Sequence, residues 1–185
     1  MKFHHRQVVR NIGRAEDWPE FLDDFHHHWP TDGDNTRVDF IRHGDVGRGA
    51  LRCGDPQWLR LTEQRCKAKS VFRFGVNGEV AKSTHSGLPW LRYLRNKIGG
   101  RIHFWPFDGW LPKPGLSVIV EVYPSLWNRT FPSDDRDSHQ QDAYSIARWM
   151  RENDANGSLE DCFRPRLQPA EQSLAQLEGW ILGVD

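Results

Sequence analysis

The sequence has little that favours a secreted or membrane protein. Its 185 residues include only three cysteines, Cys53, Cys66 and Cys162, which lie far apart and form no CxxC pair or Cys/His spacing of a zinc site. An odd number of separated cysteines favours reduced thiols inside a cell. The first residues have no apolar core like that of a signal peptide, and no apolar run approaches membrane-spanning length. We therefore expect a soluble, cytoplasmic protein with no membrane partner.

The sequence also has no excess of charge of either sign. Lys and Arg number 25, as do Asp and Glu, so the formal net charge is zero. A binding site for nucleic acid would therefore have to be a local basic patch. The length is typical of a single domain, residues 1–185, with a sizeable core.

Residues 1–60 give the weakest pattern of the chain. Residues 15–29 have aromatic and aliphatic residues at helical spacing, which predicts an amphipathic helix. His26, His27 and His28 would point in different directions on that helix, so we interpret them as a solvated helix end and not as a metal site. The glycines and charges of residues 38–55 predict an irregular segment.

The second half alternates strand-like and helix-like segments, which predicts an α/β fold. The expected helices are 57–67, 88–98, a helix from Ser138 to Asp154, and a last helix from Pro169, and the expected strands are 70–76, 101–107 and 116–124. Polar residues 83–87 supply caps for the helix at 88–98. The helix from Ser138 is expected to bury one face, made of Ala143, Ile146, Ala147 and Met150.

Two carboxylates lie at the ends of neighbouring elements. Glu121 is the one acid in the apolar strand that Pro124 ends. Asp142 follows a capping-box spacing, Ser138 with Gln141, and falls near the start of a helix, where the dipole stabilises an anion. The pair is a candidate site for a shared divalent metal ion. The alternatives are a salt bridge from Glu121 to an arginine such as Arg101 or Arg129, and an ordinary helix-start charge at Asp142.

Several segments of the second half resemble the DUF429 family, mostly prokaryotic proteins predicted to be nucleases of ribonuclease H-like fold. The matching segments are Val80–Trp90, His103–Asp108, Val120–Ser125, His139–Tyr144 and the ending Glu178–Val184. The resemblance implies a mixed sheet flanked by helices, with residues 61–185 as the C-terminal part of the domain. Nothing in residues 1–9 looks like the family's glycine-rich first strand with its aspartate ligand. We therefore expect a chain that lacks the family's N-terminal strands.

The same resemblance implies metal-dependent phosphodiester hydrolysis. Mg²⁺ or Mn²⁺ would be held by Glu121 and Asp142. His139 lies three residues before Asp142, where it would assist a proton transfer or orient a phosphate; helix capping or solvent exposure is the alternative. The resemblance also gives Lys82, Thr84 and His85 a role in binding substrate phosphate near a helix start. Ordinary capping by Ser83 or Thr84 is the alternative for that segment. Asp108 and Tyr123 are weaker candidates.

A second interpretation is non-catalytic. A domain without its first strands would leave an open sheet edge, through which it would self-associate while binding nucleic acid or a protein. The nine tryptophans fit either interpretation. Trp90, Trp149 and Trp180 have the spacing of core residues, whereas Trp105 and Trp110 flank a turn and form either a surface platform for bases or a packed corner.

Overall fold

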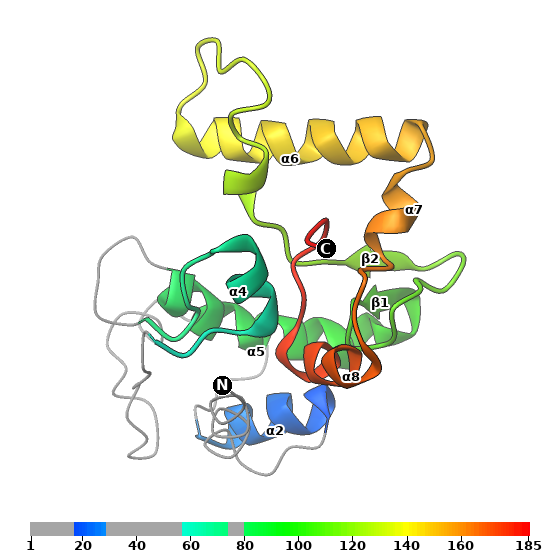
Figure 1. The fold of residues 1–185 in the computed structure, drawn as a ribbon. Helices are drawn as coiled ribbons and strands as arrows, with labels where there is room; N and C mark the ends of the chain where they lie inside the picture. The colour runs from blue at the N-terminus through cyan, green and yellow to red at the C-terminus, as the bar shows by residue number, and fades with distance from the viewer. Residues whose placement is uncertain (1–16, 29–56, 74–79) are drawn as a thin grey trace.

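The computed structural model describes residues 17–28, 57–73 and 80–185. The segment 38–55 lies outside the described residues. Figure 1 shows the elements, which in chain order are α2 (Trp18–His28), α4 (Leu61–Cys66), α5 (Val80–Ile98), the 3₁₀ helix η1 (Gly99–Arg101), β1 (Ile102–Phe104), β2 (Ser117–Ile119), the 3₁₀ helix η2 (Pro124–Leu126), α6 (Ser138–Ala155), α7 (Leu159–Cys162) and α8 (Pro169–Glu178).

The sheet of the described residues is small and parallel. β1 pairs with β2 in a register that sets His103 opposite Val118. Glu121, just beyond β2, forms a parallel bridge to Ile181, and the Leu182 amide donates to the Glu121 carbonyl at 2.9 Å. The fold is therefore helix-rich α/β, and the strands expected at 101–107 and 116–124 are confirmed only in their first halves.

The strand expected at 70–76 is wrong for its described part. Residues 70–73 form a turn in which the Ser70 hydroxyl donates to the Trp58 carbonyl and accepts from the Phe72 amide at 3.0 Å. A serine that bonds nearby backbone groups competes with a sheet ladder, which explains the turn.

One apolar core joins α2 to α5 and β1. Trp18 and Leu22 of α2 are buried with Ile102 and Phe104, and the Trp18 ring stacks on Phe107 with centroids 4.1 Å apart. The helix expected at 15–29 is thus confirmed over its described part. Its aromatic face is what holds it against the sheet.

A second core lies where the end of the chain meets β2 and the turn after β1. Its buried residues are Trp105, Leu167, Ala175, Trp180, Ile181, Leu182 and Val184. The Trp105 indole N–H donates to the Trp110 carbonyl at 2.9 Å, so this pair forms a packed corner and not a surface platform. Trp180 is a core residue as expected, but Trp90 is 46% exposed and its assignment to the core is wrong.

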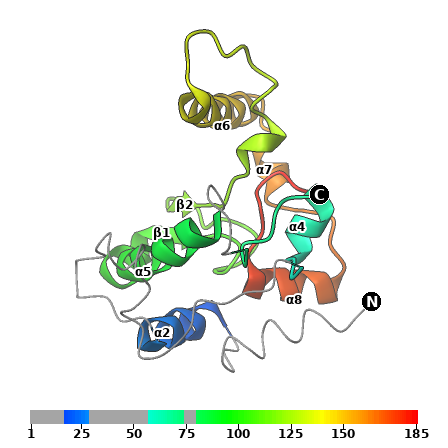
Figure 2. The same ribbon diagram turned by 90° about the vertical axis from the view of Figure 1, so that its left-hand side faces the viewer.

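Helix α6 stands apart from the sheet, as Figures 1 and 2 show, and packs against η2 and α7. The predicted buried face is wrong in half of its members, because Ala143 and Ala147 are exposed while Ile146 and Met150 are half-buried. Because α6 does not lie along the sheet, its contacts come from the loop before it and from α7.

Two helix starts also differ from expectation. α6 is capped by Asp137, which accepts from the Gln140 amide at 2.9 Å, because the Gln141 side chain is bound to the Asn128 and Phe131 carbonyls. α5 begins at Val80, so residues 83–87 lie inside the helix and do not precede it. Among the described residues, no helix is both long enough and apolar enough to cross a membrane.

Candidate functional site

Glu121 is held by an arginine 61 residues earlier in the chain. The two terminal nitrogens of Arg60, Nη1 and Nη2, donate to the two carboxylate oxygens of Glu121 at 2.7 Å each. The Arg60 side chain is 8% exposed and that of Glu121 is 42% exposed. The salt bridge considered for Glu121 is therefore present, but with Arg60 and not with Arg101 or Arg129.

Glu63 completes the neutralisation of Arg60. Arg60 Nε donates to Glu63 Oε1 at 2.9 Å, and its backbone amide donates to Glu63 Oε2 at the same distance. Burial alone would lower the pKa of Arg60. The charges and hydrogen bonds of Glu121 and Glu63 outweigh that effect and hold the pKa above its ordinary value. Burial raises the pKa of Glu63, against the opposing effect of Arg60. Arg60 is thus a permanent buried cation between two carboxylates.

These contacts connect three distant segments, and we name Arg60, Glu63, Glu121 and Glu178 the Arg60 cluster. Arg60 Nη1 also donates to the Glu178 carbonyl at 3.3 Å, and the Leu61 amide donates to Glu178 Oε2 at 3.0 Å. The start of α4, the end of β2 and the end of α8 therefore meet at one guanidinium.

Asp142 lies in a different setting. On the first turns of α6, its Oδ1 accepts from the Asn128 side-chain amide at 3.0 Å, and within the described part of the chain no ion pair includes it. His139, one turn earlier, is exposed. Glu121 and Asp142 thus have separate partners, and among the described residues no group of three or more His, Cys, Asp or Glu side chains is placed to hold a metal ion.

The candidates on α5 do not share one surface. Thr84 is exposed, whereas His85 is 5% exposed and meets the Phe25 ring of α2 edge-on, with centroids 4.8 Å apart. The side chain of Lys82 lies outside the described residues. A role in binding phosphate stays a prediction for these three residues.

Asp108 is a structural anchor near β1. Burial would raise its pKa, but hydrogen bonds from Arg95 Nη2 at 2.7 Å and the Phe104 amide at 2.9 Å, with the charge of Arg95, hold it below its ordinary value. The guanidinium of Arg95 in turn lies over the rings of Trp18 and Phe104.

Stability should therefore depend on Asp108 at acid pH. A carboxyl with a lowered folded-state pKa stabilises the fold above its unfolded pKa of about 3.9, and this contribution is lost as the pH falls through the folded value. We expect Asp108→Asn to unfold at lower urea than the unmodified chain at neutral pH, with the two midpoints converging below about pH 4. Parallel midpoint curves across that range would contradict the assignment.

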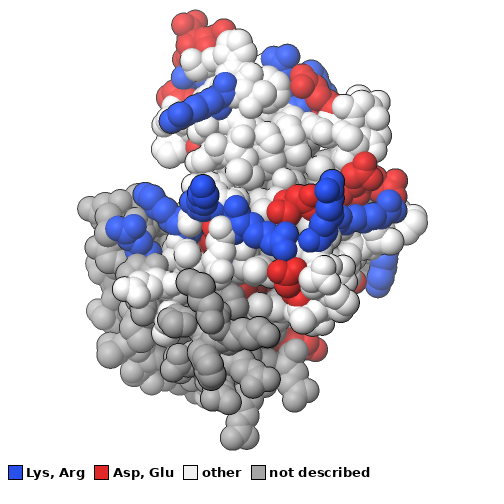
Figure 3. Space-filling model, viewed as in Figure 1, with Lys and Arg blue, Asp and Glu red and all other residues white. Residues whose placement is uncertain are grey.

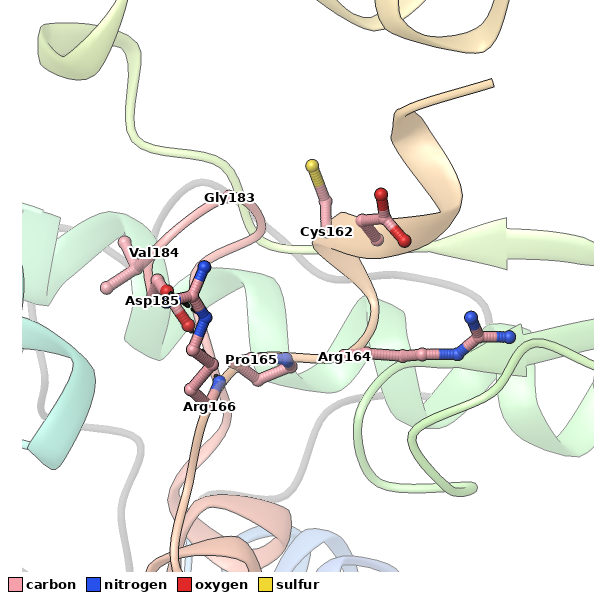
Figure 4. Close-up of a pocket in the computed structure, with 8 residues that line it drawn as sticks. Cys162, Arg164, Pro165, Arg166, Gly183, Val184 and Asp185 are labelled. Carbon is pink, nitrogen blue, oxygen red and sulfur yellow. Dashed lines mark hydrogen bonds and ion pairs between the residues drawn. The ribbon is translucent and has the colours of Figure 1, made fainter.

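An open hollow lies beside the end of the chain. Figure 4 shows its lining, and its volume is about 420 Å³. The lining residues are Asp161, Cys162, Arg164, Pro165, Arg166, Gly183, Val184 and Asp185. Arg166 Nε is 3.1 Å from Asp185 Oδ2. Burial raises the pKa of the Cys162 thiol, so this thiol is not activated as a nucleophile.

Comparison of the chain with models of protein families, with curated proteins and with solved structures finds no match. The residues that the sequence did not single out, Arg60 and Glu63, are the ones that decide the state of Glu121.

Proposed function

We propose that this chain is a catalytically inactive α/β binding domain in which Glu121 serves the fold and not a metal ion. The observation that carries the proposal is the bidentate ion pair between Arg60 and Glu121, in which both carboxylate oxygens accept hydrogen bonds at 2.7 Å. A bidentate guanidinium–carboxylate pair is among the strongest side-chain contacts. A magnesium ion would have to displace a buried cation that Glu63 and Glu178 also hold.

The proposal includes a ribonuclease H-like ancestry, supported by the parallel sheet and by the motifs of residues 61–185. If the chain self-associates through a sheet edge, the strand that pairs with the second copy is β2. The three residues of β1 are at most 9% exposed, whereas Ser117 at the start of β2 is exposed. An open edge is the part of a sheet that pairs with a second chain.

A metal-dependent nuclease is the second candidate, favoured by one observation. Asp142 is half-buried, and its contact with Asn128 is to a neutral amide. A carboxylate with no cationic partner among the described residues is the group to which Mg²⁺ or Mn²⁺ would bind.

Metal-dependent unfolding separates the two functions. An ion that binds only the folded state at about 100 times its Kd adds about 2.7 kcal/mol of stability, which raises Tm by several degrees. For a non-catalytic domain we expect Mg²⁺ or Mn²⁺ to leave Tm unchanged and a labelled oligonucleotide to stay uncut. A rise in Tm that Asp142→Asn abolishes, while the control Asp154→Asn at the other end of α6 retains it, would instead establish the metal site.

A further inference from the structure

Lys and Arg side chains gather on one face of the molecule. Figure 3 shows them following one another across the middle of that face, level with α4 and with the segment that links α7 to α8. α4 with the residues that follow it as far as Arg73, and the link from α7 to α8, supply six basic side chains, which we name the basic band: Arg65, Lys67, Lys69, Arg73, Arg164 and Arg166. The segments touch, because Arg65 Nη1 donates to the Arg166 carbonyl at 3.5 Å.

The band has local charge although the chain as a whole has none. From Gln64 to Arg73 the sequence has four basic residues and no acid. Acids do lie near the band, since Arg65 pairs with Glu171, Arg164 with Glu160 and Arg166 with Asp185. The Arg166 side chain is nevertheless 90% exposed and that of Arg164 is 52% exposed. Exposed pairs of this kind are weak, so a phosphate can compete for their guanidinium groups.

Aromatic rings lie within the same segment. Trp58 and Phe72 meet edge to face with centroids 5.9 Å apart, and both are only half-buried. Rings beside a positively charged surface are what binds unpaired bases, because every base has a face that stacks.

Hydrogen bonds to Glu63 fix the backbone of the segment after α4, which carries part of the basic band. The Ala68 amide donates to the Glu63 carbonyl at 3.0 Å, and the Val71 amide donates to Glu63 Oε1 at 3.2 Å. Lys67 ends α4 in the left-handed region with φ of 56°. Glu63, a buried member of the Arg60 cluster, therefore supports the surface that carries the charges.

We propose that the basic band, with Trp58 and Phe72 beside it, binds single-stranded nucleic acid. This inference rests on the proposed binding function and names its partner. Phosphates lie along the exposed Lys67 and the two arginines that line the hollow in Figure 4, and bases stack near the aromatic pair.

The test uses the full chain and a fluorescein-labelled oligothymidylate, followed by fluorescence anisotropy across a salt series. The double variant Lys67→Gly with Arg166→Gln removes one charge from each segment. Glycine suits the left-handed position of Lys67, so Tm is expected not to fall. Affinity at low salt should drop by about tenfold or more, and the slope of log K against log salt should lessen by about 1.4, or about 0.7 for each contact.

The matched control is Lys113→Gln with Arg151→Gln, which removes the same charge from exposed positions on the β1–β2 loop and on α6. It should bind as the unmodified chain does. No binding of the oligonucleotide, or equal loss in both double variants, would overturn the inference. Binding followed by metal-dependent cleavage would uphold the inference and refute the catalytically inactive function, so the two fail separately.

Discussion

Replacing Arg60 with alanine is expected to destabilise the fold by about 3–5 kcal/mol. The substitution leaves Glu63, whose side chain is 1% exposed, as a buried carboxylate without its cation. It also removes the contacts that join the start of α4 to Glu121 and to the Glu178 carbonyl. A buried charge that loses its partner costs more than the pair contributed while intact. The loss should appear as a lower urea midpoint.

Two further variants make this result specific. Arg166→Ala breaks an ion pair whose members are 90% and 54% exposed, so it should cost about 0–1 kcal/mol. Arg60→Lys keeps the charge but not the fork, and should fall between the other two. If Arg60→Ala and Arg166→Ala unfold at the same urea concentration, the Arg60 cluster is not what holds these segments together.

Replacing Gly183 with alanine is expected to be the second most damaging change. Gly183 has φ of +80°, which costs an L-residue about 1–2 kcal/mol. The added Cβ would also lie 2.8 Å from Cζ2 of Trp127 and 3.1 Å from Cη2 of Trp149. These two rings are stacked with centroids 4.1 Å apart, so neither gives way easily, and overpacking adds about 1–3 kcal/mol.

Gly115 provides the matched control. It has the same φ of +80°, but a Cβ there meets nothing within 4 Å. Gly115→Ala should therefore show the conformational cost alone. The difference in unfolding free energy between the two variants then measures the steric cost of the clash with Trp127 and Trp149. Equal costs would mean that the pair moves aside freely.

Local patterns predicted much of the second half of the chain. The spacing of apolar residues indicated α6 and α8, and the β-branched run indicated β2, because these signals depend on a residue's near neighbours. The capping-box spacing predicts a cap one residue late, because Asp137 and Ser138 are both good caps and only the tertiary contacts of Gln141 decide between them.

The candidate site was less predictable. Nothing in the spacing of Arg60 and Glu121, 61 residues apart, indicates that they meet. The exposure of Ala143 and Ala147 was missed for a related reason: periodicity shows that a helix has an apolar side but not what covers it. Both errors concern long-range contacts, which a single sequence does not encode in its local pattern.

The position of residues 180–184 has a consequence for how the chain folds during synthesis. Trp180, Ile181 and Leu182 are at most 2% exposed, and Ile181 bridges to Glu121 beside the sheet. On the ribosome, α4 and β2 emerge before these residues, so the second core cannot be completed until residues 180–184 have left the exit tunnel. The second core therefore closes late, and the nascent chain must keep Trp105 and its neighbours from associating with other chains until then.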